Sequence, residues 1–150
     1  CDGAADLLAH LGTAAPEVAL VTNTRRELAT HGINTLGAEN FVATVCGDEV
    51  AHGKPAPDPY LRAAALLGLD PGQCLAIEDS PTGTASAVAA GCAVLVVPND
   101  IAVPAGPGRV FRDSLVGLRI GELREIYATS LAGRGDGANR FAACQADLEQ

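Results

Sequence analysis

The segment 75–83, Leu-Ala-Ile-Glu-Asp-Ser-Pro-Thr-Gly, constrains the fold more than any other part of the sequence. An apolar run ends on two adjacent carboxylates, Glu78 and Asp79, and a helix follows with Ser80 as its predicted N-cap and Pro81 as its first residue. A continuous apolar run is typical of a strand covered by helices on both faces. Because α/β proteins bind ligands at the carboxyl ends of such strands, the two acids are predicted to point into a ligand site.

The same strand-then-helix pattern occurs along most of the chain. Short apolar runs predict strands, and segments with helical periodicity lie between them, so we expect an α/β domain with a parallel sheet and right-handed crossovers. This core is assigned to residues 1–128, and residues 129–150 to a flexible or weakly helical tail. The predicted strands are 18–21, 41–46, 74–77 and 93–97, and the predicted helices are 3–11, 24–36, 58–68, 81–90 and 121–128.

One helix start carries a specific local signal. The segment from Thr24 to Glu27 matches a capping box, in which Thr24 caps the helix and Glu27 reaches back to the cap. The sequence therefore predicts a self-capped helix that begins directly after the polar turn Thr22-Asn23.

Composition excludes several classes of protein. The formal net charge is -8, and the arginines and the single lysine, Lys54, are scattered, so no basic patch for nucleic acid is expected. No apolar stretch approaches the length of a membrane span, and no basic segment leads into an apolar one at the N-terminus. The five cysteines are far apart and are interpreted as buried reduced thiols, so we expect a cytoplasmic protein without a membrane partner.

Three polar features lie at the ends of predicted strands or in the loops just beyond them: Thr22-Asn23, Lys54 and Glu78-Asp79. In a parallel sheet they converge on one edge. Carboxylate oxygens suit Mg²⁺, while a hydroxyl and an ammonium suit phosphoryl oxygens, so the set indicates phosphoryl chemistry. Taken singly, the acids could be charges favoured at a helix N-terminus, and Lys54 could be a solvated loop residue.

A phosphate-binding P-loop is excluded. Five residues separate Gly47 from Gly53 where the motif has four, and Pro55 stands where it requires Ser or Thr. The loop around Lys54 therefore needs a different explanation.

The order of these motifs along the chain resembles that of the haloacid dehalogenase superfamily, specifically its phosphatase and β-phosphoglucomutase-like branch. The resemblance covers roughly residues 3 to 128 and rests on Leu-Val-Thr-Asn at 20–23, Gly-Lys-Pro-Ala-Pro-Asp-Pro-Tyr at 53–60, Ile-Glu-Asp-Ser-Pro-Thr-Gly at 77–83 and Ala-Ala-Gly at 89–91. It implies a Rossmann-like three-layer sandwich around the parallel sheet. It also implies that Thr22, Asn23 and Lys54 bind the phosphoryl group, with Thr22 and Lys54 assisting catalysis, and that Glu78 and Asp79 hold Mg²⁺.

The sequence departs from the family at one decisive motif. Members carry Asp-x-Asp-Gly-Thr after their first strand, where the first aspartate is the nucleophile and the second the general acid and base, and no such string occurs in these 150 residues. The resemblance implies that this central strand and the cap domain lie upstream of Cys1. We therefore expect an open sheet centre with marginal stability, or a gap that is closed by direct pairing of the flanking strands or by self-association with another chain through exposed strand edges. We also expect no turnover by these residues alone.

The function implied by the resemblance is that of a Mg²⁺-dependent phosphatase acting on a small phosphorylated metabolite through an aspartyl-phosphate. Two alternatives remain open: a phosphosugar mutase of the β-phosphoglucomutase kind, and a non-catalytic binding or interaction domain that has kept the acidic pocket.

Overall fold

A computed structural model describes residues 3–14, 17–130 and 142–146 of the chain. Helices and strands alternate through most of this part, as the sequence predicts. The helices are α1 (Ala4–Ala14), α2 (Arg26–Leu36), α3 (Asp58–Leu67), α4 (Pro81–Ala90) and α5 (Ile120–Ser130). The strands are β1 (Val18–Val21), β2 (Ala43–Val45), β3 (Cys74–Glu78), β4 (Ala93–Val96), β5 (Arg109–Phe111) and β6 (Ala142–Ala146).

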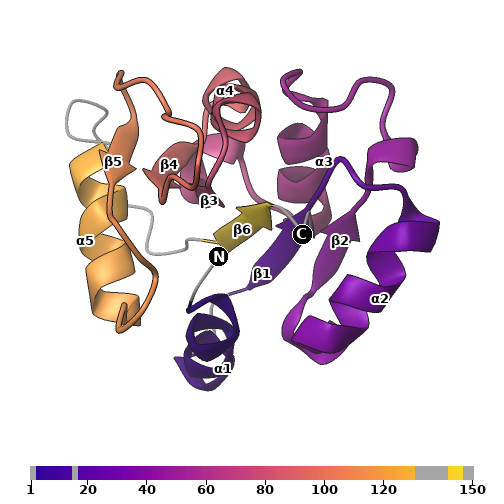
Figure 1. The fold of residues 1–150 in the computed structure, drawn as a ribbon, viewed down its shortest axis with the longest axis horizontal. Coiled ribbons are helices and arrows are strands. Elements are labelled where there is room, and N and C mark those ends of the chain that lie inside the picture. Colours follow the sequence, from indigo (N-terminus) through magenta and orange to yellow (C-terminus); the bar gives the residue numbers. More distant parts are fainter. Residues whose placement is uncertain (1–2, 15–16, 131–141, 147–150) are drawn as a thin grey trace.

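The strands form one six-stranded sheet in the order β2-β1-β6-β3-β4-β5, in which every neighbouring pair is parallel (Figure 1). β6, which is last in the chain, lies between β1 and β3 in the interior of the sheet. Ala143 is in register with Val18 on one side and with Leu75 on the other. The chain therefore joins the two halves of its sheet with a strand from its own C-terminal segment.

The expectation of an open sheet centre is wrong, because β6 occupies the place between β1 and β3. Residues 142–146 also differ from the predicted flexible or weakly helical tail, since they form a strand. Their sequence, Ala-Ala-Cys-Gln-Ala, favours helix over strand, so the pairing comes from the two neighbouring strands rather than from local preference. The other residues of the predicted tail beyond Ser130 lie outside the described part.

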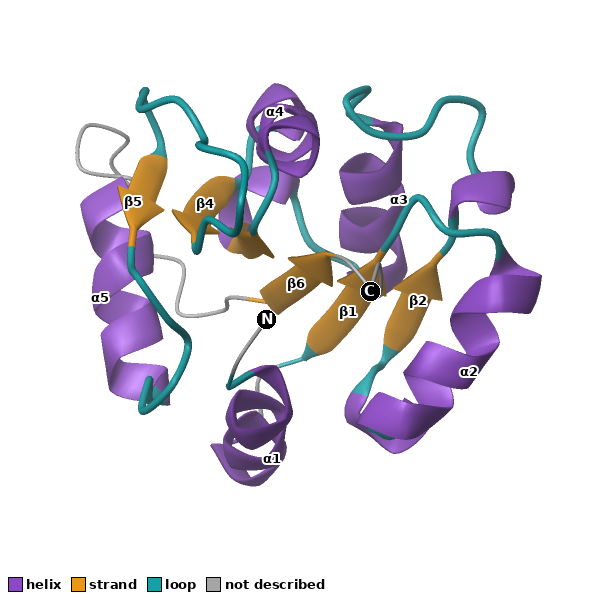
Figure 2. Ribbon diagram, viewed as in Figure 1, coloured by secondary structure: helices purple, strands orange, loops and turns teal. Residues whose placement is uncertain are grey.

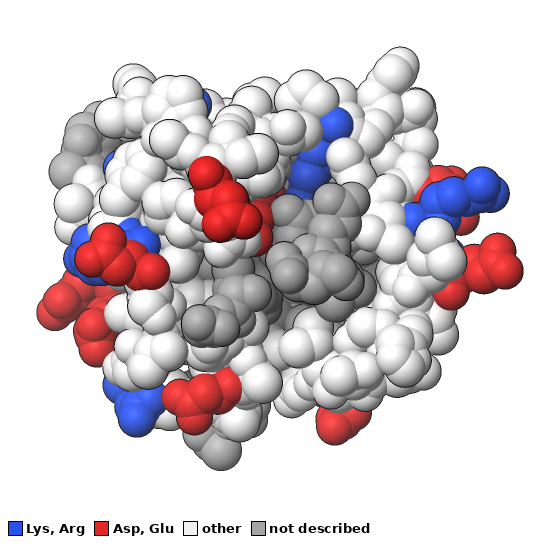
Figure 3. Space-filling view, in the orientation of Figure 1, with Lys and Arg blue, Asp and Glu red and all other residues white. Residues whose placement is uncertain are grey.

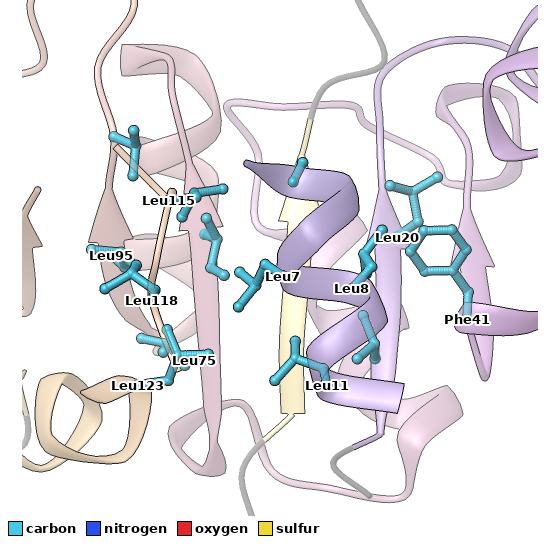
Figure 4. Close-up of a cluster of buried hydrophobic side chains, with 14 of the residues drawn as sticks. Leu7, Leu8, Leu11, Leu20, Phe41, Leu75, Leu95, Leu115, Leu118 and Leu123 are labelled. Carbon is cyan, nitrogen blue, oxygen red and sulfur yellow. The ribbon is translucent and has the colours of Figure 1, made fainter. Parts of the chain in front are cut away.

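Helices cover both faces of the sheet (Figure 2), giving the three layers expected of a Rossmann-like sandwich. Side chains of β1, β3 and β4 alternate between two cores, as the pleat requires. One core packs under α1, α2 and α5 and includes Leu7, Leu20, Leu75 and Leu123 (Figure 4). The other packs under α3 and α4 and includes Tyr60 and Val94. Both faces are apolar, so the strands have continuous apolar sequences.

Helix ends follow local signals in two cases. The Ser80 hydroxyl accepts a hydrogen bond from the Gly83 backbone N–H at 3.0 Å, and Pro81 is the first residue of α4, as predicted. The helix ends at Gly91, whose φ of 98° is a left-handed conformation that glycine adopts without strain. α3 ends in the same way at Gly68, with φ of 69°.

The predicted capping box at Thr24 is wrong. α2 begins at Arg26 behind Arg25, whose side chain makes no capping hydrogen bond. The first helical N–H, that of Arg26, donates instead to Asp48 Oδ1 at 2.9 Å, from the loop after β2. The side chain of Asp48, which is distant in the sequence, thus accepts the kind of hydrogen bond that the capping box predicted for Thr24.

Among the described residues, no helix is both long enough and apolar enough to cross a membrane. Cys46, Cys74 and Cys92 are buried, as predicted, and burial raises the pKa of Cys92 to about 12. Arg and Lys side chains are dispersed over the face seen in Figure 3, which agrees with the scattered basic residues of the sequence.

Candidate active site at the carboxyl edge of the sheet

The turn after β1 places Thr22 and Asn23 at the carboxyl edge of the sheet. Thr22 is buried, and its backbone N–H donates to Val45 O of β2 at 2.9 Å, which continues the sheet pairing by one residue. Its hydroxyl accepts a hydrogen bond from the Thr24 N–H at 3.1 Å. The Thr22 side chain is therefore held within the turn that follows β1.

Asn23 holds the loop that carries Lys54. Its side-chain oxygen accepts from the Lys54 N–H at 2.7 Å, and its side-chain nitrogen donates to Lys54 O at 3.2 Å. Two glycines permit this close approach: a Cβ at Gly47 would lie 2.0 Å from Asn23 O, and a Cβ at Gly53 would lie 2.8 Å from Asn23 Oδ1. Asn23 thus fixes the backbone of Lys54.

The Lys54 ammonium links the two strands that flank β6. Its Nζ donates to Val21 O of β1 at 3.1 Å and to Glu78 Oε1 of β3 at 2.8 Å. The Lys54 and Glu78 side chains are 3% and 0% exposed, so the ion pair is desolvated. Such a pair persists only when hydrogen bonds also satisfy its atoms, and both partners here make further contacts.

Tyr60 supplies one of those contacts and was not identified from the sequence. Its hydroxyl donates to Glu78 Oε1, and its ring lies under the Lys54 ammonium, with Nζ 5.4 Å from the ring centroid. Tyr60 is completely buried on the inner face of α3. One signal was available: Tyr60 is the last residue of the motif at 53–60 that contains Lys54.

Glu78 packs against the first turn of α4 at Gly83. A Cβ at position 83 would lie 1.9 Å from Glu78 Oε2 and 2.4 Å from Oε1. Glycine is therefore required here because the carboxylate occupies the space that a side chain would fill. The first turn of α4 and the loop lysine together enclose Glu78.

Asp79, the next residue, has a different environment. It is 7% exposed, and its Oδ2 accepts a hydrogen bond from Asn99 Nδ2 at 2.7 Å. Asn99 lies in the loop after β4 and was not identified from the sequence. The two neighbouring acids thus have different partners, a cation and a phenol for Glu78 and a neutral amide for Asp79.

The donor chemistry at this edge fits Mg²⁺. The described residues contain no cluster of three or more His, Cys, Asp or Glu side chains able to enclose a metal ion by themselves. Mg²⁺ does not need such a cage, because it keeps several waters and is commonly bound by one or two carboxylates together with substrate phosphate. Of the two acids, Glu78 is already engaged by Lys54 and Tyr60, whereas Asp79 accepts a hydrogen bond from a neutral amide.

The predicted site residues therefore lie at one edge of the sheet. Contacts join Asn23 to Lys54 and Lys54 to Glu78, while Thr22 and Asp79 directly follow the two strands that Lys54 bridges. Asp48, in the loop after β2, accepts a hydrogen bond from the first N–H of α2. A fixed ammonium, a hydroxyl in a tight turn and a buried carboxylate suit an anion bound together with a divalent cation.

Comparisons with known proteins show the family of the chain. A family model for haloacid dehalogenase-like hydrolases matches residues 1–91. Hexitol phosphatase A of Escherichia coli is 43% identical over 97 residues, which cover 63% of this chain and 44% of that protein. Beta-phosphoglucomutase of Mycobacterium bovis is 38% identical over 98 residues, which cover 63% of this chain and 37% of that protein.

The crystal structure of CbbY from Rhodobacter sphaeroides in complex with phosphate superposes with a TM-score of 0.74 and 31% identity, covering 82% of this chain and 58% of that one. The chain thus spans less than half the length of the two curated relatives. Because the family model matches more than half of the sequence and the fold agrees, the chain belongs to the haloacid dehalogenase-like hydrolases.

Proposed function

We propose that the protein is a Mg²⁺-dependent phosphatase that acts on a small phosphorylated metabolite through an aspartyl-phosphate. The observation that carries the proposal is the Lys54 ammonium, which is held between Val21 O and Glu78 Oε1 at the carboxyl edge of the sheet. A buried ammonium fixed in this way stabilises negative charge on a phosphoryl group without having to reorganise during the reaction.

In the proposal, the residues at the carboxyl edge of the sheet have two roles. Thr22 and Asn23, with their backbone, bind phosphoryl oxygens beside Lys54. Asp79 holds Mg²⁺ directly, and Glu78 contributes negative charge and fixes Lys54. When bound, Mg²⁺ would offset the charge of the phosphoryl oxygens.

The nucleophile is proposed to be an aspartate in an Asp-x-Asp-Gly-Thr motif. Because the 150 residues do not contain that string, we expect them not to turn over without the segment that supplies it. In the proposal, the strand that carries this motif takes the central place between β1 and β3 that β6 occupies in these 150 residues. Thr22, Lys54 and Asp79 would then bind and orient the phosphoryl group for attack by that carboxylate.

A second candidate activity is phosphosugar mutation. It is favoured by the 38% identity to a beta-phosphoglucomutase. The two activities differ in outcome, because a phosphatase releases inorganic phosphate whereas a mutase moves the phosphoryl group within a sugar. A non-catalytic binding domain, the third possibility, would bind phosphate without either outcome.

The test is Mg²⁺-dependent phosphate release from a panel of phosphomonoesters, measured for the full product of the gene and for the 150-residue chain. We expect hydrolysis by the former, its loss in Asp79→Asn, and full activity in the control Asp100→Asn, which alters an exposed acid in the loop after β4. Equal activity of Asp79→Asn and the unaltered protein would refute the metal assignment. Conversion of a phosphosugar without phosphate release would favour the mutase.

A further inference from the structure

The loop after β4 reaches across the end of β3. The Val97 N–H donates to Glu78 O at 2.8 Å, which extends the pairing of the two strands to their carboxyl ends. The chain then turns through Pro98, so that Asn99 lies beside the residue that follows β3. The short contact from Asn99 Nδ2 to Asp79 Oδ2, 2.7 Å, results from this turn.

An amide in this position controls the direction of a carboxylate. The side chain of Asp79 rotates about two bonds, and a hydrogen bond to one oxygen fixes the direction in which the other oxygen points. A neutral donor does so without cancelling the negative charge, whereas the neighbouring Glu78 is held by the Lys54 ammonium. Hydrogen-bond partners of this kind orient metal ligands and affect the affinity for the metal.

We propose that Asn99 is a positioning residue that orients Asp79 for a divalent cation. This inference rests on the proposed function, because it assumes that Asp79 binds the cation. It assigns a role to a residue in the loop after β4, outside the motifs at residues 20–23, 53–60 and 77–83. Asn99 is an exposed residue, so replacing it leaves both apolar cores intact.

The experiment measures Mn²⁺ binding to the 150-residue chain by electron paramagnetic resonance, which reports free Mn²⁺ and does not depend on turnover. The variants are Asn99→Ala, Asn99→Gln, Asp79→Asn and the control Asn40→Ala. The Asn40 amide donates to Leu36 O at the end of α2 and has no part in the site. Thermal unfolding of each variant shows whether it is folded at the temperature of the titration.

We expect Asn99→Ala to bind Mn²⁺ about tenfold more weakly than the unaltered chain. Asn99→Gln, whose longer side chain still carries an amide donor, should recover part of that loss, and Asn40→Ala should bind normally. Asp79→Asn should bind most weakly of all.

Two results would overturn the inference in distinguishable ways. Unchanged affinity in Asn99→Ala, together with a loss in Asp79→Asn, would remove the positioning role and leave the proposed function standing. Unchanged affinity in Asp79→Asn, or no Mn²⁺ binding by the unaltered chain, would overturn the metal assignment and the inference with it.

Discussion

The carboxylate of Glu78 packs directly on the Cα of Gly83, so closely that a Cβ there would lie 1.9 Å from Oε2. Glu78 is 1% exposed and is already held by Lys54 and Tyr60, so it cannot move aside without losing those contacts. The first turn of α4 and the ion pair therefore depend on each other. The requirement for glycine at position 83 follows from packing, since this residue lies inside a helix and has no left-handed φ.

Gly83→Ala should lower the free energy of unfolding by about 1–3 kcal/mol, the usual cost of overfilling a packed interior. Urea unfolding measures the change. Gly121→Ala is the matched control, because a Cβ there meets nothing within 4 Å in α5 and alanine favours the helix. If both variants unfold at the same urea concentration, the close packing of Glu78 on Gly83 is not a constraint on the sequence.

Lys54→Met should destabilise the protein by about 3–5 kcal/mol, because it leaves the Glu78 carboxylate buried without its cation. The double variant Lys54→Met with Glu78→Gln should be more stable than Lys54→Met, since glutamine removes the uncompensated charge and can still accept the Tyr60 hydrogen bond. A double-mutant cycle from urea unfolding measures the coupling. Additive effects of the two substitutions would contradict direct pairing.

Residues with local signals could be placed from the sequence, and those positioned by distant contacts could not. Ser80, Pro81 and Gly91 define α4 by their own chemistry, and the apolar runs predict four strands of the sheet. Thr24 failed as a cap because Asp48, from another loop, supplies the acceptor. Motif order indicated Lys54 and Glu78, but nothing in the local pattern shows that Asn99 reaches the site.

The strand β6 is the clearest case of tertiary context overriding local preference. Its alanines and glutamine are weak strand formers, whereas β1 and β3 beside it are buried at every residue and leave backbone groups to be paired. β6 therefore follows from backbone pairing with its two neighbours, which present N–H and C=O groups on both sides of it. Sequence periodicity does not detect this.

Ala143→Pro should destabilise the protein by about 2–3 kcal/mol, because proline removes a backbone donor from a strand paired on both sides. Ala105→Pro is the control, since Ala105 is exposed in a loop that already contains Pro104 and Pro107. Urea unfolding compares the two variants. Equal midpoints would mean that β6 does not contribute to stability in solution.

The contact between α2 and the loop after β2 should weaken in acid. The side-chain hydrogen bond from Arg26 holds the pKa of Glu49 below its ordinary value of 4.5, so the stabilisation is present above that value and is lost as the pH falls through the lower, folded-state pKa. Arg26 Nη2 lies 2.7 Å from Glu49 Oε1, but both side chains are more than a third exposed, so solvent screening limits the effect to less than about 1 kcal/mol.

Glu49→Gln should therefore be slightly less stable than the unaltered protein at pH 7, and the difference in urea midpoint should shrink toward pH 3. Glu39→Gln, an exposed acid elsewhere, is the control, and a difference for Glu49→Gln that stays constant from pH 7 to pH 3 would contradict the ion pair.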